Sequence, residues 1–143
     1  MKKALLLTIV LMLGASMAFA GTGSIGIFAD NAGVSCNLSD PGAGLTQYFI
    51  VHVNAVSVSA SQYSAPKPAC FTSTYLSDTN AFPVTVGSSQ TGVSVGYGSC
   101  RTSPILLQTL SYFTSGTTPV CCYYPVLADP NAVPATLQPL VAP

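Results

Sequence analysis

Short runs of alternating apolar residues, divided by turn-forming residues, constrain this chain more than any other feature. Such runs cover residues 25–29, 82–86 and 93–97, and residues 105–113 are apolar on both faces, as in a central strand. Turn formers such as Gly, Ser and Thr fill the segments between runs, for example at residues 87–92. About six to eight short strands of this kind predict an all-β fold. We expect a single antiparallel β-sandwich of immunoglobulin-like or jelly-roll topology, with a closed barrel as the alternative.

The segment from residue 48 to residue 58 has the strongest strand pattern, with a break inside it. Its apolar residues change parity at Asn54-Ala55. Because a slip of one residue moves every side chain to the other face of a sheet, this change predicts either a β-bulge or two strands with a tight break. A further β-like run at residues 121–127 is weakened by Pro125. The Pro-rich residues 131–143 predict either a loose tail or a final edge strand.

The first twenty residues have the pattern of a signal peptide. Lys2 and Lys3 precede an apolar run, and Ala18-Phe19-Ala20 supplies the small-x-small cleavage pattern. We therefore expect a signal peptide at residues 1–20, a sandwich domain at residues 21–130, and secretion to the periplasm, the cell surface or the medium. The apolar run is too short for a transmembrane helix, and no second long apolar run follows it, so no membrane span is expected in the mature chain.

Charge is scarce after residue 20. The charged side chains there are Lys67, Arg101, Asp30, Asp40, Asp78 and Asp129, and the sequence has no Glu. Without a basic patch, neither nucleic acid nor anionic lipid is an expected partner. A surface made of Ser, Thr, Asn and Gln repels its neighbours weakly, which favours self-association.

Five cysteines follow the predicted signal peptide, and an oxidising compartment favours disulfides among them. Neighbouring residues on a strand point to opposite faces, so Cys121 and Cys122 would have different partners. We expect Cys100 to pair with one of them and Cys70 with the other, while a strained bridge between the two neighbours is the alternative. Cys36 is then the odd thiol, either free or available for an intermolecular crosslink.

Asp and Asn recur together at three places and are the candidate metal ligands. Asp-x-Asn supplies oxygen ligands of the kind that Ca²⁺ binds in extracellular modules. The alternative is an Asx-turn, in which the side chain accepts a hydrogen bond from its own backbone, and we favour it because no Glu is present. Calcium is thus the single candidate cofactor, with these candidate ligands: Asp30, Asp78, Asn80, Asp129 and Asn131.

No catalytic constellation is visible. His52 is the only histidine and lies in an apolar run, and the chain has no P-loop or His-Glu-x-x-His motif. Gly92-Val-Ser-Val-Gly96 has the Gly-x-Ser-x-Gly spacing, but it lies within an alternating strand-like run and does not form a nucleophile elbow before a helix. The cysteines also lack the spacing of a zinc site. We therefore expect a protein that is not an enzyme, and a hydrolase using His52 is the least favoured alternative. Tyr97, Tyr123 and Tyr124 offer either a sugar-binding platform or core packing, and core packing is favoured.

Three stretches of the chain resemble small secreted bacterial proteins with cohesin-like or immunoglobulin-like sandwiches. They are residues 21–30, residues 48–53 and Gly92-Val-Ser-Val-Gly-Tyr-Gly-Ser-Cys100. The resemblance implies a bacterial exported protein and brings no catalytic residue with it. We expect a non-catalytic structural, adhesive or assembly role at the bacterial cell surface, in which exposed strand edges add strands from neighbouring molecules. The alternative is a small extracellular binding module for glycan or protein, assisted by calcium.

Overall fold

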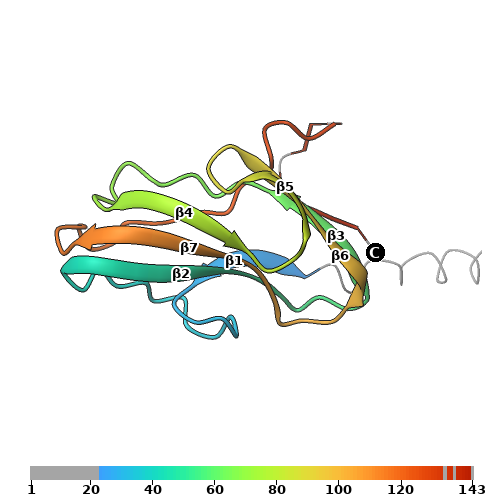
Figure 1. Ribbon diagram of the computed structural model, residues 1–143, viewed down its shortest axis with the longest axis horizontal. Helices are drawn as coiled ribbons and strands as arrows, with labels where there is room; N and C mark the ends of the chain where they lie inside the picture. The colour runs from blue at the N-terminus through green and yellow to red at the C-terminus, as the bar shows by residue number, and fades with distance from the viewer. Residues whose placement is uncertain (1–22, 134, 137, 143) are drawn as a thin grey trace, which may run out of the picture.

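Two antiparallel β-sheets pack face to face in the computed structural model, which describes residues 23–133, 135, 136 and 138–142 (Figure 1). The described residues contain no helix. The all-β sandwich predicted from the sequence is confirmed, whereas the predicted signal peptide lies outside the described residues. The strands in chain order are β1 (Ser24–Phe28), β2 (Ala43–Val53), β3 (Val58–Tyr63), β4 (Thr74–Asn80), β5 (Val84–Ser88), β6 (Gly92–Arg101), β7 (Ile105–Ser115) and β8 (Leu140–Ala142).

Each sheet contains four strands. Sheet A has the order β1-β2-β7-β4, and sheet B has the order β5-β6-β3-β8. The edge strands are therefore β1 and β4 in sheet A, and β5 and β8 in sheet B. The run at residues 105–113 was predicted as a central strand, and β7 confirms this because it pairs with both β2 and β4.

The parity change near Asn54 marks the point where the chain leaves one sheet for the other. β2 ends at Val53 in sheet A, and β3 begins at Val58 in sheet B. Asn54 and Ser57 have φ values of 57° and 58°, which give the chain its sharp turn. The buried Ala55 fixes this corner, because its N–H donates to Ser103 Oγ at 3.0 Å and its carbonyl accepts from Ser103 N at 2.9 Å. Of the two predictions, the tight break between two strands is the correct one.

Two segments differ from the sequence-based expectation. The Asp-x-Asn motif at residues 78–80 suggested a turn, but it belongs to β4, an edge strand whose residues are mostly exposed and therefore lack apolar alternation. The run at residues 121–127 is not a strand: its only bridge joins Leu127 to Ser64. Cys121 has a φ of 66° and Pro125 has no N–H, so this segment cannot form a regular ladder. The tail ends in the three-residue edge strand β8.

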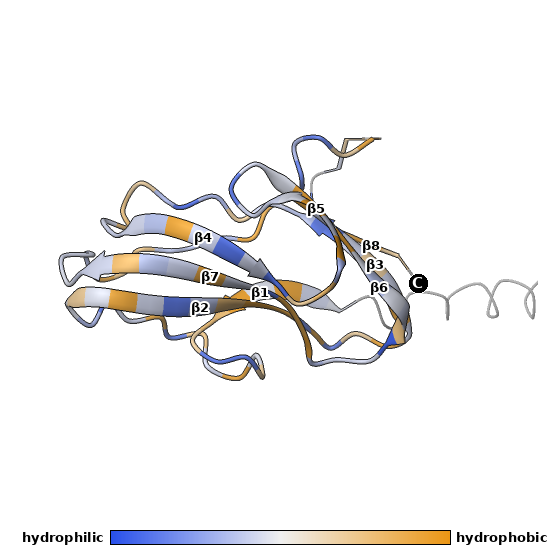
Figure 2. Cartoon of the chain, viewed as in Figure 1, coloured by the Kyte–Doolittle hydropathy of each residue, from blue (hydrophilic) through white to orange (hydrophobic). Residues whose placement is uncertain are grey.

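The space between the sheets is filled by apolar side chains and by polar groups with partners. Figure 2 shows hydrophobic and hydrophilic residues mixed along β2 and β7. Along most of β7, buried residues alternate with residues that are partly buried or exposed. Tyr63 of β3 donates its hydroxyl proton to Gln108 Oε1 of β7 at 3.0 Å. His52 Nδ1 of β2 lies 3.0 Å from the hydroxyl of Tyr97 of β6. Both contacts join sheet A to sheet B, so they fix how the sheets pack as well as satisfying buried polar atoms.

Candidate functional site

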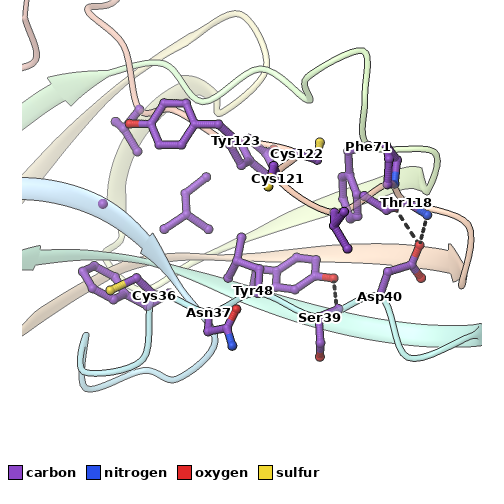
Figure 3. A pocket seen from close by; sticks show the side chains of 18 of the residues that line it. Cys36, Asn37, Ser39, Asp40, Tyr48, Phe71, Thr118, Cys121, Cys122 and Tyr123 are labelled. Atoms are coloured by element: carbon purple, nitrogen blue, oxygen red, sulfur yellow. Dashed lines mark hydrogen bonds between the residues drawn. The ribbon is translucent and has the colours of Figure 1, made fainter.

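A groove of about 710 Å³ lies between the edge strand β1 and the segment at residues 118–126 (Figure 3). Residues 36–40 form one wall and residues 118–123 form the other. The floor consists of four side chains that are less than 10% exposed: Ile27, Tyr48, Phe71 and Tyr124. The groove is thus a mostly apolar channel beside a strand edge.

The floor of the groove is a packed cluster of rings. Phe71 meets Tyr48 and Tyr112 edge to face, with ring centroids 5.7 Å and 5.0 Å apart. The Tyr48 hydroxyl donates to the Ser39 carbonyl at 2.7 Å, and the Tyr124 hydroxyl donates to the Ala65 carbonyl at 3.0 Å. Burial, with a smaller contribution from the Asp40 charge, raises the pKa of Tyr48 to about 12. The floor is therefore rigid and uncharged at neutral pH.

Asp40 fastens the two walls together at one end of the groove. Its carboxylate accepts hydrogen bonds from Gly116 N at 2.7 Å, from Thr118 N at 3.1 Å and from Thr118 Oγ1 at 2.7 Å. The hydrogen bond from the Thr118 side chain, helped by the backbone donors, lowers the pKa of Asp40 despite an opposing effect of desolvation. Among the described residues, Asp40 is the only charged one that lines the groove, and its oxygens already accept hydrogen bonds.

The disulfide between Cys70 and Cys122 fastens the second wall to the loop that carries Phe71. It is one of the pairings expected from the sequence. The expected second bridge, from Cys100 to the neighbouring pair, does not form. Cys100 lies near the end of β6 in sheet B, whereas Cys121 lies in the wall beside β1 at the edge of sheet A. Cys36, Cys100 and Cys121 are free and exposed.

The structure brings two of these free thiols to the same groove. Cys36 belongs to the first wall and Cys121 to the second (Figure 3). The sequence identified Cys36 as the odd thiol but gave no signal that Cys121 would lie opposite it, because the groove forms only when distant segments pack together. Cys121 has a positive φ, a backbone conformation that is costly for a residue with a Cβ.

One side of β1 has no strand partner among the described strands. β1 pairs with β2 in an unbroken register from Ser24–Val53 to Phe28–Phe49. In an antiparallel pair, the backbone N–H and C=O groups that do not face the partner point to the opposite side. Residues 25–28 of β1 line the groove. Just after the strand, the N–H of Ala29 already donates to the Ser35 carbonyl at 2.7 Å.

β1 also differs from the other edge strands in what protects it. Natural edge strands are blunted by bulges, prolines, charges or short length. β4 has a bulge between Tyr75 and Ser77, β5 follows Pro83, and β8 has only three residues. β1, with the sequence Ser-Ile-Gly-Ile-Phe, has none of these devices. It is therefore the edge best suited to accept another strand.

The candidate calcium ligands lie outside the groove and have hydrogen-bond partners. Asp30 accepts hydrogen bonds from the backbone N–H groups of Ala32, Val34 and Ser35, and these bonds, above all the one from Ser35, lower the pKa of Asp30. The other carboxylates and amides make comparable contacts: Asp78 with Ser89, Asn80 with Gln108, Asp129 with Gln62 and Asn131, and Asn131 also with Thr91. Across the described part of the chain, no three His, Cys, Asp or Glu residues gather into a metal site. Asp30 and Asp129 accept hydrogen bonds from backbone N–H groups two residues later, as the turn alternative predicts, whereas Asp78 and Asn80 lie in β4. Calcium stays a prediction.

The remaining candidate residues, His52 and the three tyrosines, do not come together in one site, although Tyr123 and Tyr124 line the groove. His52 is fully buried between the sheets, where it contacts Tyr97. Of the three tyrosines considered for sugar binding, Tyr97 and Tyr124 are buried, and only Tyr123 is exposed, at 77%. A platform of exposed rings is therefore not assembled from these residues.

Comparison of the chain with family models, with curated proteins and with solved structures gives no match. Among the described residues there is no helix that is long and apolar enough to cross a membrane. The function is therefore inferred from the fold and the groove.

Proposed function

We propose that this protein is a non-catalytic exported bacterial protein with a structural or adhesive role at the cell surface, and that it assembles by accepting a strand from a neighbouring molecule. The observation that carries the proposal is the free side of β1, which lies along the groove. An added strand would pair with the backbone of β1 and place alternate side chains on the aromatic floor.

The chemistry of the groove defines the strand that it suits. The floor offers Ile27, Tyr48 and Phe71, so every second side chain of the added strand should be apolar. The charge of Asp40 is already satisfied by Thr118 and Gly116, so the groove offers no partner for a Lys or Arg. Burying an unpaired charge there would be costly. The proposed guest is therefore an extended, uncharged segment of another exported chain.

Export is supported by two features of different kinds. The first twenty residues have the pattern of a signal peptide, and the folded domain contains the disulfide Cys70–Cys122. A disulfide of this kind persists in the periplasm or outside the cell and is rare in the cytosol. The absence of a catalytic constellation in the sequence agrees with a structural role.

The test blocks the free side of β1 with the charge that natural edge strands use. In Gly26→Lys, the new Cβ would meet the ring of Phe28 at 3.0 Å, so that ring must move by a few tenths of an ångström. The matched control is Thr79→Lys on β4, an exposed position on the other edge of the same sheet. We expect the wild-type chain and the control to form concentration-dependent oligomers and to be retained on exporting cells, and Gly26→Lys to be released and to lose the larger oligomers.

Size-exclusion chromatography with light scattering measures the assembly, and immunoblotting of cell and medium fractions measures retention. Circular dichroism and the unfolding midpoint establish that each variant is folded. The proposal fails if the wild-type chain is a concentration-independent monomer that is not retained. It also fails if folded Gly26→Lys assembles and is retained as the wild-type chain is.

A further inference from the structure

The outer face of sheet B contains a second hollow, separate from the groove beside β1. It has a volume of about 420 Å³ and is lined by residues of β3, β5, β6 and β8. The register places Val84 and Val86 of β5 beside Gly96 and Ser94 of β6. Ala60 and Gln62 of β3 follow on the same face, and Ala142 and Leu140 of β8 complete it.

The side chains on this face vary in size across the sheet. Val84 and Val86 form a ridge on one edge strand and are 62% and 73% exposed. Leu140 forms a lower ridge on the opposite edge strand and is 37% exposed. Gly96 and Ala60, with almost no side chain, form the floor between the ridges. The face is thus a shallow trough with apolar walls.

We propose that this trough is a docking surface for a second copy of the same chain, which packs sheet B against sheet B around a two-fold axis. With the axis above the boundary of β5 and β6, each Val84–Val86 ridge lies over the β6 floor of the other copy. The surface is then complementary to itself, as an isologous interface requires. Side chains of two stacked sheets interdigitate in this way in a sandwich core.

Charge favours a second copy over a charged partner. None of the residues that line the trough is Asp, Glu, Lys or Arg. Gln62, at the border of the face, is held by Asp129 Oδ2 at 2.8 Å. Two copies can therefore meet without desolvating an unpaired charge and without repulsion between like charges.

The shape of the trough disfavours a small ligand. It is open along its whole length between two low ridges, whereas pockets for small molecules bury most of the ligand surface. The exposed side chains of the trough come from short segments of four strands, which is less surface than a standard interface covers, so we expect a weak, concentration-dependent dimer.

The test is made in the Gly26→Lys background with the free thiols alkylated, so that neither strand addition at β1 nor crosslinking contributes. Light scattering and sedimentation should then show a monomer–dimer equilibrium. Val86→Lys places a charge on the ridge and should weaken the dimer by about tenfold or more. The matched control is Leu45→Lys, a 68% exposed position on the outer face of sheet A, which should leave the dimer unchanged.

A second variant distinguishes shape complementarity from nonspecific association of apolar surfaces. Ser94→Leu adds apolar surface but fills the floor beside Val86, so docking by ridge and trough predicts a weaker dimer. A stronger dimer in Ser94→Leu would contradict the proposed fit. A chain that stays monomeric at all concentrations in the Gly26→Lys background would also overturn the proposal, whether or not it binds the apolar dye anilinonaphthalene sulfonate. Because that background lacks the β1 interaction, failure here leaves the proposal for β1 intact.

Discussion

At the scale of single residues, the four aspartates explain how so weakly charged a chain keeps its loops in place. Each carboxylate accepts hydrogen bonds from loop backbone or from polar side chains. Asp40 joins the two walls of the groove, and Asp78 of β4 in sheet A holds Ser89, which follows β5 of sheet B. Charge-assisted hydrogen bonds are stronger than neutral ones, so a few carboxylates suffice. The acidic residues thus shape the loops around an uncharged surface.

The free thiols allow the groove to be probed at single residues. Cys36 and Cys121 line the groove, whereas Cys100 is exposed elsewhere. We predict that a bulky maleimide on Cys36, in a chain with Cys100→Ser and Cys121→Ser, removes the larger oligomers, because the adduct occupies the space of an added strand. The same label on Cys100, with Cys36→Ser and Cys121→Ser, should leave them unchanged. Light scattering before and after labelling measures the difference, and equal effects of both labels would contradict the assignment of the groove.

At the scale of elements, the disulfide holds a segment that makes little regular structure. The wall at residues 118–123 contains no β-bridge, and the nearest one joins Leu127 to Ser64. The wall depends on Cys122 and on the Asp40 contacts for its position. Cys70 and Cys122 are separated by 52 residues. The bridge therefore closes a long loop of the unfolded chain.

We predict that Cys70→Ala combined with Cys122→Ala lowers the free energy of unfolding by about 4 kcal/mol, the loop-entropy value for a closure of this length. Cys100→Ser is the control, because Cys100 is free and exposed, and it should change the free energy of unfolding by less than about 0.5 kcal/mol. Denaturant unfolding followed by circular dichroism gives both values. A loss below about 1 kcal/mol in the double variant would show that the wall is held by other contacts.

The elements also show how far the sequence predicts the structure. Alternation predicted β1, β2, β6 and β7 and the break at Asn54, because the period of apolar residues follows directly from which face is buried. β3 (Val58–Tyr63) was found only at its first residue, because its sequence Val-Ser-Ala-Ser-Gln-Tyr has few apolar residues. β4 was missed because an edge strand with mostly exposed residues has no such period. The groove could not be predicted, because its floor and walls come from residues far apart in the chain, such as Ile27, Phe71 and Tyr124. The pairing of cysteines depends on the same long-range packing.

At the scale of the whole molecule, both sheets share one core in which tyrosines link them. Tyr63 of β3 contacts Gln108 of β7, and Tyr97 of β6 contacts His52 of β2. Burial raises the pKa of Tyr97 to about 12, and burial raises the pKa of Tyr63 well above 10.0. A tyrosinate at either place would be a charge between the sheets. Ionisation of these rings and separation of the sheets are therefore coupled events.

This coupling predicts cooperative unfolding in base. Above pH 10.0 the unfolded chain releases its tyrosine protons, while the folded chain keeps those of Tyr48 and Tyr97 until about pH 12. In this range the unfolded state binds fewer protons than the folded state. The contribution of these tyrosines to the free energy of unfolding is therefore complete below pH 10 and is lost as pH rises above it. Denaturant unfolding at a series of pH values should show this fall, and tyrosinate absorbance should rise together with the loss of circular dichroism.

Tyr97→Phe tests the origin of the effect. The variant loses the contact with His52, which lowers the free energy of unfolding at all pH values. It also removes one hydroxyl proton whose release is coupled to unfolding. The slope of the unfolding free energy against pH should therefore become shallower by up to about 1.4 kcal/mol per pH unit between pH 10 and pH 12. Tyr123→Phe is the control, because Tyr123 is 77% exposed, and it should keep the wild-type slope. If Tyr97→Phe also kept that slope, ionisation of Tyr97 would not be among the events that drive unfolding in base, and the fall in stability would have to come from the other buried tyrosines, such as Tyr63.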